Sequence, residues 1–118
     1  FAPGIPQVYY VGLLAGKNDL KLLEETKEGR NINRHYYSNE EIAEEVQRPV
    51  VKALLNLFSF RNRSEVFDLE GTIDVETPTA HSIVIKRQNK DKSVTAVAEI
   101  NLQNQTYRVI ENGIEVTF

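Results

Sequence analysis

Nine consecutive residues, Gly29 to Tyr37, bring together several side chains that could bind a ligand. They read Gly-Arg-Asn-Ile-Asn-Arg-His-Tyr-Tyr and contain two arginines, two asparagines, a histidine and two tyrosines. Arginine presents a planar fork of donors that suits carboxylates and sugar hydroxyls, and tyrosine presents a flat face with a polar tip. The string is therefore a candidate binding loop. The alternative is a solvated loop whose tyrosines pack on a neighbouring helix.

The sequence has few residues that could form a metal, cofactor, phosphate or nucleic-acid site. The two histidines, His35 and His81, lie far apart and there is no cysteine, so the sequence predicts no metal site and no cofactor. Gly12 and Gly16 lack the tight spacing and following helix of a phosphate-binding loop. The net charge of −3 argues against nucleic acid. No apolar run is long enough to cross a membrane, and we expect a cytoplasmic protein.

A strand and a short helix are predicted ahead of the loop. Val8–Val11 is an unbroken apolar run within Gly4 to Gly12. A strand that is apolar on both faces is usually covered on both sides and has parallel neighbours. No other run in the chain resembles it. It is either the last strand of a barrel whose other strands are missing, or an ordinary buried strand or short core helix. Asp19 is the predicted cap of a helix from Leu20 to Glu28, with its leucines inward and Gly29 at its end.

A longer helix is predicted after the loop. Ser38 and Glu41 have the spacing of a capping box, and apolar residues then recur every three or four positions. Pro49 lies within this pattern and should kink or split the helix near Gln47–Arg48, because proline lacks the backbone donor. The helix is expected to fade at residues 61–64.

The apolar period changes from about 3.6 to 2 after Phe67. Alternation recurs in several short segments, with Val94 to Leu102 placing five apolar residues on one face. Asn112-Gly113 is a strong signal for a two-residue hairpin. The pattern predicts an antiparallel meander of about five strands, one face apolar and one wet. The predicted division lies within Asn62 to Leu69, giving domains at 1–62 and 63–118 of an α+β chain.

The order strand, loop excursion, helix, small β module resembles the C-terminal end of α-amylase superfamily enzymes. There the eighth barrel strand and its helix lead into an antiparallel domain. Longer strings are more specific, and they resemble the bacterial sucrose phosphorylases of glycoside hydrolase family 13. These strings are Gln7-Val-Tyr-Tyr-Val-Gly-Leu-Leu-Ala-Gly-Lys-Asn-Asp19, Gly29-Arg-Asn-Ile-Asn-Arg-His-Tyr-Tyr37 and Arg48-Pro-Val-Val-Lys-Ala53. The β module resembles the family in position and pattern.

The resemblance implies both a fold and a reaction. Residues 1–62 would be the last strand and helix of a (β/α)8 barrel, and residues 63–118 its C-terminal β domain. Sucrose phosphorylases convert sucrose and phosphate into α-glucose 1-phosphate and fructose with retention, using an aspartate nucleophile and a glutamate acid/base. In the family these residues follow earlier barrel strands. No catalytic residue is therefore expected in this chain, which should be inactive without the rest of the barrel.

One substrate-binding residue is implied by the same resemblance. The family keeps an arginine after strand eight that pairs with an aspartate at the base of the glucose pocket. By position in the string it matches Arg30, with Arg34 as the alternative. Many relatives have Asp where this chain has Asn31. The location suits a site, because barrel enzymes place theirs at the C-terminal ends of the strands.

A second class of function is a non-catalytic β module that binds carbohydrate or a partner chain. The absence of tryptophan and of an exposed aromatic stripe gives this interpretation little support. Because the chain starts at Phe1 and contains no methionine, we expect it to be a fragment or a processed product. The unpaired strand Val8–Val11 then predicts a dimer or swapped homo-oligomer, since exposed strand edges pair with other chains.

Overall fold

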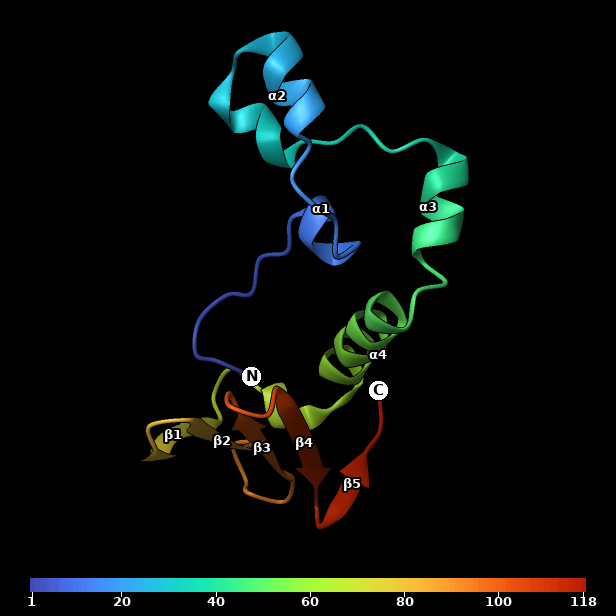
Figure 1. The fold of residues 1–118 in the computed structure, drawn as a ribbon. Coiled ribbons are helices and arrows are strands. Elements are labelled where there is room, and N and C mark those ends of the chain that lie inside the picture. The colour runs from blue at the N-terminus through green and yellow to red at the C-terminus, as the bar shows by residue number, and fades with distance from the viewer. The chain divides into compact units, whose positions relative to one another are not determined.

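The computed structural model describes residues 1–118 and divides into two compact units, each treated separately. One unit comprises Phe1–Ile5 with Ser59–Thr117, and the other comprises Pro6–Phe58 with Phe118. The elements in chain order, labelled in Figure 1, are the helices α1 (Tyr10–Leu13), α2 (Leu20–Thr26), η1 (Gly29–Asn33), α3 (Asn39–Glu45), α4 (Pro49–Arg63) and η2 (Glu65–Phe67), then the strands β1 (Thr72–Thr79), β2 (Ser82–Gln88), β3 (Thr95–Asn101), β4 (Thr106–Glu111) and β5 (Ile114–Val116).

The five-stranded sheet confirms the predicted antiparallel meander. The strands lie in the order β1-β2-β3-β4-β5, so each pairs with the next one along the chain (Figure 1). The β4–β5 hairpin turns at Asn112 and Gly113, whose φ angles of 48° and 82° are the positive values that a tight two-residue turn requires. Pro78 lies in the edge strand β1, where the register shifts between Glu76 and Thr79. An edge position tolerates proline because its missing N–H is not needed for the ladder.

One face of the sheet forms the core of this unit. Ile85, Ala98 and Val109 lie opposite one another on β2, β3 and β4, and all are buried. Phe67 closes the end of this face, where its ring meets Phe1 edge-on with centroids 5.2 Å apart. The alternation of apolar and polar residues therefore predicted the inward face correctly, because a strand turns successive side chains to opposite sides.

The split of the long helix at Pro49 is also confirmed. α3 ends at Glu45, and α4 begins with Pro49 itself. Proline suits a first helical position, where its missing N–H has no intrahelical partner to lose. Ser38 caps α3 as predicted: its hydroxyl accepts from Glu41 N, and Glu41 Oε2 accepts from Ser38 N at 2.6 Å.

The predicted strand at Val8–Val11 is not formed in this structure. Tyr10–Leu13 is instead the short helix α1, and Leu13 and Leu14 donate backbone hydrogen bonds to the carbonyls of Tyr9 and Tyr10. A strand needs neighbours for its backbone groups, and this chain supplies no parallel partner. The backbone bonds locally instead, in line with the short-helix alternative, and Val11 alone of the run is buried.

The helix before the loop is shorter than predicted. α2 starts after Asp19 as expected, and the Asp19 carboxylate accepts from Leu22 N at 2.9 Å. It ends at Thr26 because Lys27 adopts the left-handed conformation, with φ 56°. Gly29 therefore opens η1 rather than ending α2. Leu20, predicted inward, is 60% exposed.

Candidate functional site

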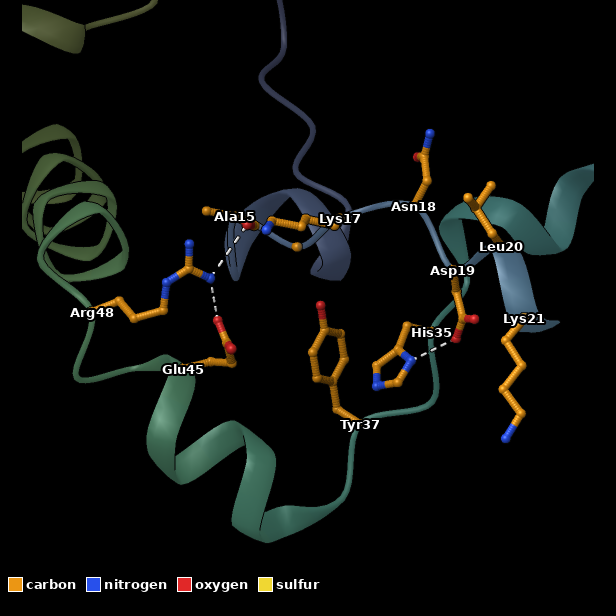
Figure 2. A pocket seen from close by; sticks show the side chains of 11 residues that line it. Ala15, Lys17, Asn18, Asp19, Leu20, Lys21, His35, Tyr37, Glu45 and Arg48 are labelled. Atoms are coloured by element: carbon orange, nitrogen blue, oxygen red, sulfur yellow. Dashed lines mark hydrogen bonds and ion pairs between the residues drawn. The ribbon is translucent and has the colours of Figure 1, made fainter. Parts of the chain in front are cut away.

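The unit formed by Pro6–Phe58 with Phe118, called the helical unit below, contains an open cavity of about 630 Å³ beside the predicted binding loop. Its walls come from the segment between α1 and α2, from the end of the loop, and from the turn between α3 and α4 (Figure 2). The lining residues are Ala15, Gly16, Lys17, Asn18, Asp19, Leu20, Lys21, His35, Tyr37, Glu45 and Arg48. The lining thus mixes polar and apolar surface and carries charges of both signs.

His35 lies between two carboxylates at one side of this cavity. Its Nδ1 is 2.7 Å from Asp19 Oδ2 and its Nε2 is 3.3 Å from Glu41 Oε1. The hydrogen bond with Asp19, followed by that with Glu41, raises the pKa of His35 despite partial burial. The pKa of Asp19 is lowered by His35 and by Leu22 N, and that of Glu41 is lowered by Ser38 N and by His35. The three groups therefore favour their charged forms together.

Arg48 and Tyr37 also line the cavity, and the Tyr37 ring lies against that of His35. Arg48 Nη1 donates to the carbonyls of Leu14 and Ala15 at 3.2 and 3.4 Å and also pairs with Glu45. The Tyr37 hydroxyl points toward the segment after α1 (Figure 2). It lies so close to Gly16 that a Cβ there would be only 2.2 Å from its oxygen, so a larger residue at position 16 would displace the Tyr37 side chain. Burial raises the pKa of Tyr37, which keeps its hydroxyl protonated.

The two arginines predicted to bind substrate do not line this cavity. Arg30 lies in η1, and its Nε and Nη2 each donate to Glu28 Oε2 at 2.8 Å, with 66% of the side chain exposed. Arg34 follows η1 and is also exposed. Asn31, between them, is buried and donates from Nδ2 to Thr26 Oγ1 at 3.0 Å. Both guanidinium groups thus point to solvent from a backbone that is anchored beneath them.

The acidic side chains around the cavity are already engaged. Asp19 accepts from Leu22 N and pairs with His35, Glu41 pairs with Ser38 N and His35, and Glu45 pairs with Arg48. A nucleophile or general acid needs a carboxyl group that faces the reacting atoms with room to exchange protons. These groups hold structure in place, and no cluster of three or more His, Asp and Glu side chains could bind a metal ion. The arrangement fits substrate positioning better than catalysis.

His35 and Tyr37 belong to the string predicted to be functional, but the connection from His35 to Asp19 was missed. Asp19 was predicted only as a helix cap, and it lies 16 residues from His35. No local period links the two positions. Only the fold brings them together, so the sequence carried no signal for the pair.

Comparison with known proteins identifies relatives of the chain. It is 74% identical over 118 residues to sucrose phosphorylase of Streptococcus mutans, which covers all of this chain and 24% of that protein. The chain is a homologue of the C-terminal part of sucrose phosphorylases. Sucrose phosphorylase of Bifidobacterium adolescentis is 52% identical over 99 residues, covering 84% of this chain and 19% of that protein. No protein-family model matches.

A solved structure agrees with the sequence relatives. The crystal structure of sucrose 6F-phosphate phosphorylase from Thermoanaerobacter thermosaccharolyticum matches with a TM-score of 0.86 and 43% identity, over 98% of this chain and 23% of that one. The chain therefore spans about a quarter of the length of that protein and of the Streptococcus mutans sucrose phosphorylase, and the matches confirm the resemblance predicted from the three strings. No helix of the chain has the length and apolar character needed to cross a membrane.

Proposed function

We propose that this chain is the C-terminal part of a retaining phosphorylase that converts sucrose and phosphate into α-glucose 1-phosphate and fructose. The observation that carries the proposal is the 74% identity over the whole chain to the sucrose phosphorylase of Streptococcus mutans. In this proposal the catalytic aspartate and glutamate lie in the part of the protein outside this chain. The engaged carboxylates around the cavity support that assignment, because none is free to attack or protonate a sugar.

Residues 1–62 would supply the eighth strand and eighth helix of the barrel, and residues 63–118 its β domain. The exposure of Val8, Tyr9 and Tyr10, between 39% and 51%, supports this part of the proposal. Three consecutive apolar or aromatic residues with bare faces are unusual on a free surface. With parallel neighbours on both sides, the same residues would satisfy their backbone groups as a strand and cover the barrel interior.

Arg30 is the residue we propose for the glucose pocket. Its present partner, Glu28, takes only the Nε and Nη2 donors through a single oxygen, so the Nη1 donors have no partner. A guanidinium with free Nη1 donors can bind a second carboxylate, and this bond would aim the carboxylate at sugar hydroxyls. Arg34 is exposed, with its backbone N–H donating to the carbonyl of Asn31 at 3.1 Å, and its side chain remains the alternative.

The test uses the longer protein that carries this chain, assayed for glucose 1-phosphate formation from sucrose and phosphate. Arg30→Ala should lower kcat/KM by roughly 30- to 5,000-fold, equivalent to about 2–5 kcal/mol, because it strands a buried carboxylate. Arg34→Ala is the matched control and should change kcat/KM by less than about threefold. The reverse pattern would move the assignment to Arg34, and two unaffected variants would refute it.

The same assay addresses the alternative of a non-catalytic β module. The isolated 118-residue chain should form no glucose 1-phosphate, and calorimetric titration with sucrose, starch and glucans should give no binding heat. Clear binding by the isolated chain would favour the module. A cytoplasmic location and a homo-oligomeric state remain predictions.

A further inference from the structure

Three segments of the helical unit meet at the imidazole of His35. Asp19 comes from the start of α2, Glu41 from the first turn of α3, and His35 from the binding loop between them. The Nδ1–Oδ2 distance to Asp19 is 2.7 Å and the Nε2–Oε1 distance to Glu41 is 3.3 Å. Both carboxylates also bind backbone N–H groups, of Leu22 and Ser38 respectively. The orientation of each carboxylate is therefore fixed before it meets the histidine.

Two further hydrogen bonds hold the backbone of the loop that carries Arg30 and Arg34. Asp19 N donates to the carbonyl of Ile32 at 2.6 Å, inside η1. The Tyr10 hydroxyl donates to the carbonyl of His35 at 3.0 Å, so the backbone at the end of the loop is tied as well. Release of the His35 side chain would loosen the C-terminal half of the loop, where Arg34 lies, and would weaken the tie at Ile32.

We propose that His35 is a positioning residue of the phosphorylase: as an imidazolium bridging Asp19 and Glu41, it fixes the loop that presents Arg30 to the glucosyl group. The inference rests on the proposed function for its catalytic consequence. The bridge itself rests on the distances above. It adds a role for three residues that do not themselves touch the reacting atoms.

The bridge depends on protonation, because two carboxylates on the two ring nitrogens require both nitrogens to carry hydrogen. The groups around the His35 ring are Asp19 at the start of α2, Glu41 of α3 and the Tyr37 ring. The Tyr37 ring is edge-on to that of His35, with the two centroids 4.6 Å apart. The positive charge of Lys21, on α2, helps to lower the pKa of Asp19. The pKa of His35 is raised, so the bridge is complete below its ordinary value near 6.5 and is lost as the pH rises through the raised value. The lowered pKa values of Asp19 and Glu41 extend it on the acid side beyond the range in which ordinary carboxyl groups take up protons.

Two substitutions separate the bridge from simple packing in the longer protein. His35→Phe keeps a flat ring but removes both N–H groups, and should lower kcat/KM for sucrose by about tenfold or more, the effect of losing charge-assisted hydrogen bonds. His35→Asn places an amide N–H where Nδ1 lies, so it should keep the bond to Asp19 and stay within about threefold of the parent near pH 6. Because asparagine does not titrate, the ratio of kcat/KM in His35→Asn to that in the parent should rise between pH 6 and 8.5.

The inference is overturned if His35→Phe stays within twofold of the parent, or if the His35→Asn ratio is flat with pH, since a purely structural side chain would give no such slope. Circular dichroism of each variant confirms that the fold is kept. If the parent protein forms no glucose 1-phosphate from sucrose, the proposed function fails, and the bridge is then tested by NMR. In Asp19→Asn the His35 pKa must fall; an unchanged His35 pKa would refute the bridge.

Discussion

Replacing Arg87 by methionine tests how the segment before the first helix is attached to the sheet. Arg87 is only 6% exposed on β2, and its Nε and Nη2 donate to the carbonyls of Phe1 and Ala2 at 2.8 and 3.3 Å. Its guanidinium also lies 5.0 Å from the centre of the Phe67 ring. Methionine keeps most of the apolar stem but removes every donor and the charge.

The magnitude follows from these contacts. A hydrogen bond from a charged donor contributes about 1.5–3 kcal/mol, the weaker 3.3 Å bond less than the other, and a partly buried cation over an aromatic ring adds roughly 0.5–2 kcal/mol. Burial and the nearby charge of Arg61 work in the opposite direction, and they lower the pKa of Arg87. Removing an unpaired buried charge recovers part of that cost. We expect a net loss of about 2–3 kcal/mol in the free energy of unfolding.

Urea denaturation of the chain, followed by circular dichroism, measures this loss. Arg108→Met is the matched control on the outer face of the same sheet, where Arg108 pairs with Glu99 at 2.8 Å and is half exposed. That exposed pair should contribute less than about 1 kcal/mol. Equal effects of the two substitutions would mean that the Arg87 contacts add nothing beyond a surface ion pair.

Substitutions at three further positions test local features of the fold, each by its urea midpoint. Gly113→Ala should cost roughly 1–2 kcal/mol, since a Cβ there meets no atom and the loss is backbone strain at φ 82° alone; a neutral result would contradict the tight turn. Ser38→Ala should cost about 1 kcal/mol through loss of the helix cap, and Ser38→Asp should restore it. Asn31→Asp removes the donor to Thr26, and should cost about 1 kcal/mol. If Asn31→Asp were stabilising, the Thr26 hydroxyl would have to donate to the new carboxylate.

The features predicted correctly from the sequence are those whose signals lie within a few residues. The spacing of Ser38 and Glu41 gave the capping box, Pro49 gave the helix break, and Asn112-Gly113 gave the hairpin. In each case the residues that carry the signal also make the contact. Strand alternation worked for a similar reason, because consecutive strands pair with one another and need no distant partner.

The features that were missed depend on partners far away in the chain or outside it. Val8–Val11 has the composition of a covered strand, but composition cannot provide the neighbours that a strand requires. Asp19 and His35 are joined only by the fold. The end of α2 illustrates a smaller failure, since Lys27 adopts the left-handed conformation usually left to glycine, two residues before Gly29.

The most direct test of the account compares the longer protein with this chain alone in one assay, the phosphate-dependent release of glucose 1-phosphate from sucrose. We expect release by the longer protein, a strong loss in its Arg30→Ala variant, and none from the isolated chain. Release of glucose 1-phosphate by the isolated 118 residues would contradict the account, because it would require a nucleophile and an acid in a chain whose cavity carboxylates are engaged.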